Sequence, residues 1–121
     1  MVPGKYNLPE IRRGDTYPSR NIATVTDKAT GDPIAISSAR LQIRDEISNL
    51  VIYEWSTTLG NMTITGAGNN IVTLGALAIG DTEGFTTGPR HKYDLEITTS
   101  DSKTWTILEG RVEIVEDITR D

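Results

Sequence analysis

Few side chains in this sequence could carry out catalysis. His91 is the only histidine and cysteine is absent, so a thiol nucleophile is excluded and a Ser-His-Asp triad could be built only around His91. No Gly-x-Ser-x-Gly elbow accompanies this histidine. We therefore interpret His91 as a polar residue at the start of a strand. The sequence predicts no catalytic residue and no enzymatic activity.

Carboxylates are the remaining candidates for acid–base chemistry or for a metal. Catalytic acid–base pairs need environments that separate their pKa values, and nothing local predicts such burial here. No Asp-x-Asp-x-Asp-Gly calcium loop is present, and the absence of cysteine excludes thiolate metal sites. We expect solvated turn residues, no metal and no cofactor. The acidic pairs are Asp45 with Glu46, Asp81 with Glu83, and Glu116 with Asp117, and the scattered turn carboxylates are Asp27, Asp32 and Asp101.

Two short motifs have known partners in other proteins. Arg13-Gly14-Asp15 spells the integrin-binding tripeptide, which works when a flexible loop presents both charges outward. A simple turn into the first strand explains these residues better. Asn61-Met62-Thr63 is a glycosylation sequon, but Met1 to Glu10 lacks the apolar region of a signal peptide, so we interpret the sequon as accidental.

The aromatic residues are expected mainly in the core. Trp55 and Trp105 each lie on the apolar side of a predicted strand, and sugar stacking would require one of them to be exposed beside another aromatic ring. Tyr93 has two interpretations that the sequence leaves open. It is either a plain core aromatic or a tyrosine corner, whose hydroxyl ties the preceding connection to the body of the domain.

Alternating apolar residues indicate the strands that would position these side chains. The period of two expected of a half-buried strand is clear in 39–45, 51–55 and 91–99. Further β-prone runs cover 19–27, 62–65 and 71–74, with hairpin connections at 46–50 and 66–70 and a connecting turn, at most a short helical turn, at 76–83. About eight short strands are typical of a β-sandwich or, as the alternative, a small β-barrel.

The last predicted strand changes its inward parity once. Trp105 and Ile107 lie on odd positions, whereas Val112 and Ile114 lie on even positions, with Gly110 between them. One inserted residue would return both pairs to the same face. We therefore predict a β-bulge at or near Gly110, or alternatively a strand that crosses between sheets.

Length and charge limit the organisation and the partners. The chain has 121 residues, which fits one domain at 11–121, and residues 1–10, with Pro3, Gly4 and Pro9, are expected to form a flexible N-terminal arm. A formal net charge of -5 argues against a partner such as duplex DNA. No apolar run is long enough to cross a bilayer as a helix. Protein partners are expected.

Two segments carry a resemblance to a known group of proteins. YDLEITTSDSKTWTILEGRVEIVEDITR, from Tyr93 to Arg120, resembles the ending of small phage and prophage virion proteins. RRGDTYPSRNIATVTDKATGDPIAISSARLQIRDE, with Gly14-Asp15-Thr16 before the first strand, is similar to the opening of tail and baseplate domains of the upper-baseplate-protein type. The resemblance implies an all-β, immunoglobulin-like β-sandwich of about seven or eight strands. It brings no catalytic residues.

The same resemblance implies a role and a location. The expected function is that of a non-enzymatic structural component of the virion, in the tail, baseplate, neck or capsid surface, assembled in the host cytoplasm in many copies or as a homo-oligomer. Its partners would be other virion proteins, reached by β-augmentation or by side-chain packing at exposed sheet edges. The alternative is a host-receptor or glycan-binding module that uses the loops 66–70 and 80–88.

Overall fold

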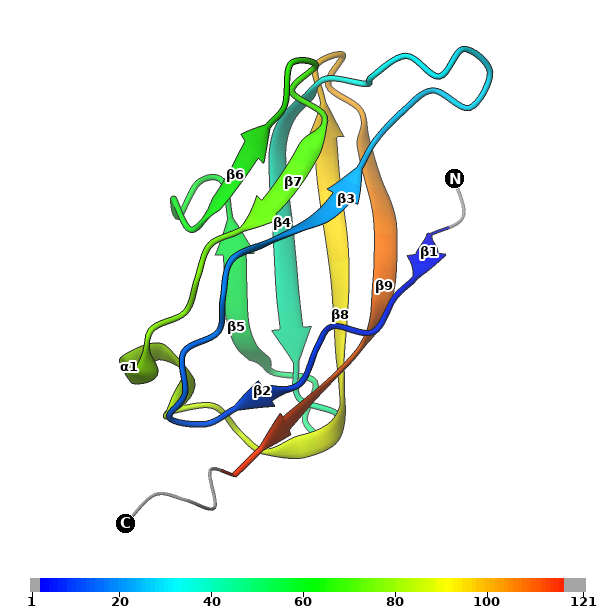
Figure 1. Ribbon diagram of the computed structural model, residues 1–121. Coiled ribbons are helices and arrows are strands. Elements are labelled where there is room, and N and C mark those ends of the chain that lie inside the picture. Colours follow the sequence, from blue (N-terminus) through cyan, green and yellow to red (C-terminus); the bar gives the residue numbers. More distant parts are fainter. Residues whose placement is uncertain (1–2, 117–121) are drawn as a thin grey trace.

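The computed structural model describes residues 3–116, in which nearly all regular structure is β-strand (Figure 1). No helix in this part of the chain is long and apolar enough to cross a membrane. The strands in chain order are β1 (Gly4–Lys5), β2 (Ile11–Arg12), β3 (Arg20–Thr24), β4 (Ile36–Arg44), β5 (Val51–Ser56), β6 (Met62–Thr65), β7 (Ile71–Leu74), β8 (Gly88–Thr99) and β9 (Thr104–Val115), and one short helix, α1 (Ile79–Thr82), precedes β8.

The strands form two sheets that pack face to face. The larger sheet has the order β5-β4-β8-β9, with β1 and β2 both paired in parallel to the outer side of β9, and the smaller sheet has the order β3-β7-β6. If β3 to β9 are lettered B, C, C′, D, E, F and G, the sheets become B-E-D and C′-C-F-G, which is an immunoglobulin arrangement. The predicted immunoglobulin-like β-sandwich is confirmed by this strand order, and the alternative of a closed barrel is wrong.

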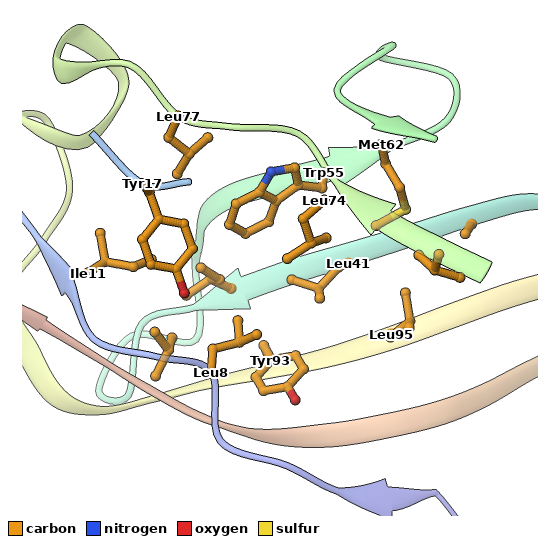
Figure 2. Close-up of a cluster of buried hydrophobic side chains, with 14 of the residues drawn as sticks. Leu8, Ile11, Tyr17, Leu41, Trp55, Met62, Leu74, Leu77, Tyr93 and Leu95 are labelled. Atoms are coloured by element: carbon orange, nitrogen blue, oxygen red, sulfur yellow. The ribbon is translucent and has the colours of Figure 1, made fainter. Parts of the chain in front are cut away.

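The two central strands of the larger sheet supply the middle of the core (Figure 2). Leu41 of β4 lies beside Leu95 of β8, and Ile43 lies beside Tyr93, and all four side chains are buried. They face the smaller sheet, whose Val72 and Leu74 are also buried, as Figure 2 shows for Leu74. The alternation predicted for both strands is therefore confirmed. Their remaining side chains form the opposite, outward face of the larger sheet.

The two tryptophans differ in burial. Trp55 is completely buried, and its indole Nε1 donates a hydrogen bond to the carbonyl oxygen of Gly75 at 3.0 Å. The ring of Tyr53 meets it edge-on, with centroids 4.9 Å apart. Trp105 lies beside Ile97 and is half-buried. The predicted core position is confirmed fully for Trp55 and in part for Trp105.

The N-terminal segment is part of the sandwich rather than an arm, which corrects the expectation for residues 1–10 over the described residues 3–10. The N–H groups of Tyr6 and Leu8 donate to the carbonyl oxygens of Glu109 and Arg111, at 3.0 and 2.9 Å. Leu8 is only 4% exposed. Because burying a leucine contributes about 2 kcal/mol to folding, this segment belongs to the domain.

The predicted bulge in β9 is present, near Gly110 but not at it. Leu108 pairs with Leu95 and Thr106 with Glu96, so Ile107 is the inserted residue, three positions before Gly110. Pairing at Gly110 itself is regular, opposite Tyr93. A Cβ at Gly110 would overlap the carbonyl oxygen of Tyr6. Glycine is therefore needed there because the N-terminal segment passes directly over the strand.

The predicted connections are also found. Residues 66–70 join β6 to β7 as a hairpin in which Gly66 and Asn69 have positive φ values of 89° and 50°. Residues 46–50 join β4 to β5, and α1 is the short helical turn in the connection between β7 and β8. Of these connections, only 46–50 joins two strands of the larger sheet.

Candidate interaction surface

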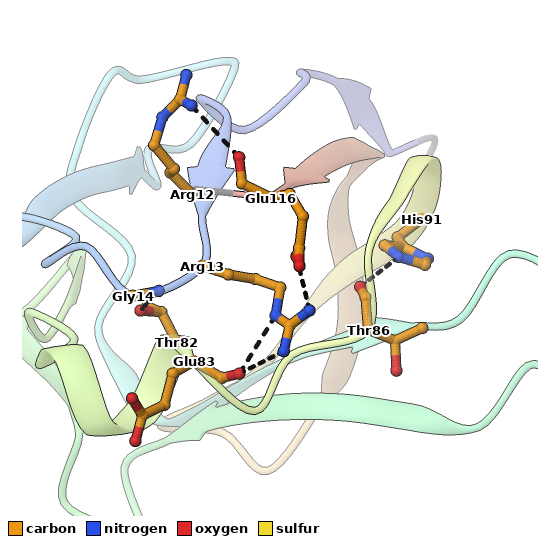
Figure 3. Close-up of polar contacts among 8 residues, drawn as sticks. All are labelled: Arg12, Arg13, Gly14, Thr82, Glu83, Thr86, His91 and Glu116. Carbon is orange, nitrogen blue, oxygen red and sulfur yellow. Dashed lines mark hydrogen bonds and ion pairs between the residues drawn. The ribbon is translucent and has the colours of Figure 1, made fainter. Parts of the chain in front are cut away.

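His91 is held in a structural role (Figure 3). It is 1% exposed, its Nδ1 accepts a hydrogen bond from the N–H of Glu46 at 3.1 Å, and its Nε2 lies 2.9 Å from the carbonyl oxygen of Thr86. These partners select the neutral ring with the proton on Nε2. Both nitrogens are thus occupied by backbone groups. His91 lies near the start of β8, as expected, but it is a buried residue.

The acidic pairs mostly fasten turns. Asp45 accepts hydrogen bonds from the N–H groups of Ser48 and Ile47, and these bonds hold the pKa of Asp45 below its usual value. Asp81 accepts from the N–H of Ala78 at 2.9 Å, at the start of α1. Glu116 pairs with Arg13, whereas its neighbour Asp117 lies outside the described residues.

The carboxylates considered for calcium lie in separate turns. Asp27 accepts from the N–H groups of Ala29 and Thr30, and Asp101 accepts from the hydroxyl of Thr99, which lowers the pKa of Asp101. Asp32 is exposed in the turn that Asp27 begins. Over residues 3–116, no group of three or more potential ligands is arranged to hold a metal ion.

The Arg13-Gly14-Asp15 tripeptide is folded against the body of the domain (Figure 3). Arg13 donates through Nη2 and Nε to the carbonyl oxygen of Glu83, at 2.9 and 3.2 Å, and through Nη1 to Glu116 at 2.7 Å. Gly14 has a φ of 81°, and the hydroxyl of Thr82 accepts its N–H and donates to the carbonyl oxygen of Asp15. The interpretation as a turn is confirmed.

Asn61 of the sequon closes the free edge of the larger sheet. Its Oδ1 accepts from the N–H of Ser56 at 2.7 Å, and its Nδ2 donates to the carbonyl oxygen of Glu54 at 2.9 Å. A side chain thus replaces a neighbouring strand along β5. The register between β4 and β5 also shifts at Ile52, where a bulge interrupts the edge.

The outward face of the larger sheet carries its charges in ordered rows. Strand pairing aligns Arg44 with Lys92 and Lys92 with Arg111, so that three cations lie side by side on β4, β8 and β9. We call this the basic row. A second row lies two residues away along the strands, and we call it the acidic row. Its members, in order across the sheet, are Glu54, Gln42, Asp94 and Glu109.

The two rows differ in how their charges are satisfied. Gln42 donates to Glu54 at 2.6 Å, and Lys5 of β1 pairs with Glu109. In the described part of the chain, no carboxylate lies within ion-pair distance of the basic row; Arg44 instead donates to Gln42 and to the carbonyl oxygen of Asn49. Like charges directly opposite each other destabilise a sheet, so folding alone gives no reason for this row.

Two hollows lie on this face. One, of about 630 Å³, spans the basic and acidic rows. The other, of about 340 Å³, lies toward the beginning of β4 and the end of β5. Arg40 and Glu96 form an ion pair there at 3.3 Å. The residues of the second hollow are Ser38, Ala39, Arg40, Glu54, Ser56, Thr57, Thr58, Glu96 and Thr98.

An apolar hairpin borders the first hollow. Ile47, Leu50 and Val51, which we call the hairpin tip, are 93%, 70% and 45% exposed. The backbone around them is well bonded, because Asp45 binds two N–H groups of the turn and donates its own N–H to the carbonyl oxygen of Leu50 at 2.8 Å. The tip is thus a rigid, exposed apolar projection.

The 46–50 connection was predicted from the sequence, but its role as an apolar projection was not. The signal was three large aliphatic residues in or beside a short turn, where polar residues are usual. The two charge rows had no comparable signal, because their members come together only through the pairing of strands distant in sequence.

The loops considered for glycan binding lie at opposite ends of the domain (Figure 1). Asn69 bonds to Ile36 at the beginning of β4, whereas Gly88 lies against the side chain of Glu46, just past the end of β4. The loops 66–70 and 80–88 are therefore separated by the length of this strand. They do not combine into one binding surface.

No protein-family model and no curated protein matches the sequence. Solved structures with a similar fold include CopC from Methylosinus trichosporium OB3b, at 11% identity over 90% of this chain and 88% of that chain, with a TM-score of 0.48. A chicken TCR is similar at 12% identity over 98% of this chain and 56% of that chain, with a TM-score of 0.49. At this level of similarity neither structure bears on function, and the fold assignment rests on the strand order above.

Proposed function

We propose that this chain is a non-enzymatic structural component of a phage particle that binds other proteins through side chains of its larger sheet. The phage assignment is supported by the resemblance of the segment from Tyr93 onward and of the opening Gly14-Asp15-Thr16. The binding role is supported by the geometry. A non-enzymatic role fits the structural use of His91, whose two ring nitrogens are both bonded to backbone groups.

The hairpin tip is the observation that carries the proposal. A rigid turn that exposes Ile47 at 93% and Leu50 at 70% contributes little to the core of its own domain. Exposed apolar side chains that gather on one surface are typical of protein interaction sites. Burying both against a partner would contribute about 3 kcal/mol or more to binding.

Side-chain packing is favoured over β-augmentation at this sheet. The edge at β5 is closed by Asn61 and interrupted at Ile52, and the edge at β9 is occupied by β1 and β2. Added strands need an edge with free N–H and C=O groups. At the larger sheet, contact through the outward face and the tip is therefore better supported than β-augmentation.

Incorporation into particles tests the proposal. Phage carrying the gene are prepared with the wild-type chain, with the double variant Ile47→Asp, Leu50→Asp, and with the control Leu59→Asp, which alters a residue that is 61% exposed outside the tip. We expect the tip variant to fold with an unchanged melting temperature yet to be missing from purified particles, as measured by mass spectrometry. The control should be incorporated.

Two results would contradict the proposal. Absence of the wild-type chain from purified particles would overturn the phage assignment. Normal incorporation of the tip variant would overturn the role of the tip in assembly.

A further inference from the structure

We infer that a second copy of this chain docks on the outward face of the larger sheet, so that the basic row of each copy meets the acidic row of the other. This names one partner for the protein-binding surface of the proposed function and rests on that surface. The symmetry axis would be a two-fold that runs across the strands, at the level where Ile43, Tyr93 and Gly110 pair.

The position of this axis follows from the strand register. Arg44, Lys92 and Arg111 lie one residue to one side of that level, and Gln42, Asp94 and Glu109 lie one residue to the other. Rotation about this axis places each strand over the same strand of the second copy, with the two strands running in opposite directions. The rows, about 7 Å apart along the strands, then exchange places.

Each ionic contact in such a dimer occurs twice. Lys92 of one copy faces Asp94 of the other, and Arg111 faces Glu109, as a self-complementary interface requires. The strands of facing sheets cross at about 30°, so facing residues move out of register with distance from the axis. The charges that match best are therefore those beside the axis, and on the central strand β8 these are Lys92 and Asp94. Both of these side chains are exposed and have no ion-pair partner within the described residues.

The hairpin tip fits the same arrangement. Leu50 bonds to Asp45, two residues beyond Ile43, and Ile47 lies further out along the hairpin. The two-fold therefore brings the tip over the stretch 39–41 of the second copy. The hollow of about 340 Å³, which Ala39 and Arg40 help to line, lies at this position on the face. One symmetry operation thus pairs the charges and places the projection over a hollow.

Other partners suit the face less well. Asp94 and Glu109 lie in the same hollow as the basic row, so a polyphosphate such as nucleic acid would meet repulsion there. The only aromatic residue lining that hollow is Tyr93, whose side chain is buried and cannot stack on a sugar. A surface that presents both charges in adjacent rows is best satisfied by its own reversed copy.

Charge exchange tests the contact at the axis. Lys92→Glu and Asp94→Lys are purified separately, and the dissociation constant of each is measured by analytical ultracentrifugation. Each variant makes two attractive contacts repulsive, so we expect both to dimerise at least about tenfold more weakly than the wild type. Lys28→Glu and Asp32→Lys make the same changes in charge in the connection between β3 and β4, away from the face, and should dimerise normally.

Mixing the two variants distinguishes this arrangement from a general charge effect. In a heterodimer of Lys92→Glu with Asp94→Lys, both axis contacts become attractive again. Native mass spectrometry of an equimolar mixture should therefore show heterodimers in excess over either homodimer. The double variant Lys92→Glu, Asp94→Lys should recover the homodimer on its own.

The outcomes separate this inference from the proposed function. A wild-type chain that stays monomeric at about 1 mM, or variants that fail to form heterodimers on mixing, would overturn the two-fold dimer. If tip variants were then still missing from particles, the proposed function would stand with another protein as partner. A dimer with the expected exchange, in a chain absent from particles, would support the inference and contradict the phage role.

Discussion

The hydroxyl of Tyr93, in the centre of β8, donates a hydrogen bond to the backbone carbonyl oxygen of Tyr6. This bond crosses β9 at Gly110, the position that lacks a side chain. Tyr93 is therefore both a core aromatic, at 3% exposed, and an anchor. It holds the N-terminal segment rather than the connection before β8, so the tyrosine-corner interpretation was right about an anchoring bond and wrong about its partner.

Replacing Tyr93 by Phe should destabilise the domain by about 1 to 2 kcal/mol, because it removes one buried hydrogen bond and leaves the carbonyl oxygen of Tyr6 without this donor. Urea denaturation followed by tryptophan fluorescence measures the change. Tyr6→Phe is the matched control, since Tyr6 takes part through its backbone and its own side chain is 44% exposed. A loss below about 0.5 kcal/mol for Tyr93→Phe would show that the bond contributes nothing.

Gly110→Ala should be more damaging than either tyrosine change. The new methyl group would overlap the carbonyl oxygen of Tyr6 and force the N-terminal segment away from β9, which exposes Leu8. We expect a loss of about 2 kcal/mol or more in the free energy of unfolding. Gly84→Ala, where no atom lies within 4 Å of the added carbon, is the control.

A truncation identifies the cause of that loss. In a chain that begins at Asn7, the overlap with Tyr6 no longer exists, and the remaining close contact of the added carbon is 3.1 Å, to Cε1 of Tyr93. Gly110→Ala should therefore lower the melting temperature much less in the truncated chain than in the full chain. The truncation itself should lower the melting temperature, whereas removal of a detached arm would leave the melting temperature unchanged. Equal effects of Gly110→Ala in the full and truncated chains would show that the N-terminal segment does not lie over β9.

The sequence predicts best the elements whose pattern is local. β4 from Ala39 and β8 from His91 bury every second side chain, so their alternation is visible without knowledge of their partners. The N-terminal segment lacks such a pattern, because its strands β1 and β2 have only two residues each and it contributes isolated apolar residues such as Leu8. Its place in the fold depends on parallel pairing with the other end of the chain, which composition does not reveal.

Long-range pairing also explains what was missed at the candidate site. Arg44, Lys92 and Arg111 are each ordinary outward residues of an amphipathic strand, and only the register of three strands makes them a row. The bulge illustrates the same limit. Parity showed that one residue is inserted in β9, but the glycine that suggested the site is required for another reason. It gives room to the backbone of Tyr6, a contact that the sequence does not show.

Alkaline pH should destabilise the domain through its buried tyrosines. Burial raises the pKa of Tyr17 to about 12, partly opposed by the nearby guanidinium of Arg20, and burial also raises the pKa of Tyr93. The unfolded chain releases these protons near pH 10 while the folded chain keeps them. Stability is therefore complete below pH 10 and falls between pH 10 and 12, by up to about 1.4 kcal/mol per pH unit for each tyrosine.

The Tyr93→Phe variant isolates one of these groups. This variant lacks the Tyr93 hydroxyl and its raised pKa, so its free energy of unfolding should fall less steeply with pH. The difference in free energy of unfolding between wild type and variant, the stability gap, should therefore narrow from pH 9 to pH 11. Urea titrations of both proteins at each pH measure this gap. If the gap stays constant, Tyr93 releases its proton equally in the folded and unfolded states, and the expected effect of its burial is absent.

His91 should matter for stability. In His91→Phe, a ring remains at this position but the N–H of Glu46 and the carbonyl oxygen of Thr86 lose their partners. Leaving buried backbone groups unpaired costs about 1 to 3 kcal/mol, so the midpoint of urea unfolding should fall clearly. Arg90→Gln, at an exposed position of the same strand, should change it little. A His91→Phe variant as stable as the wild type would mean that neither bond contributes, and His91 would again be available for a role other than joining the start of β8 to the turn after β4.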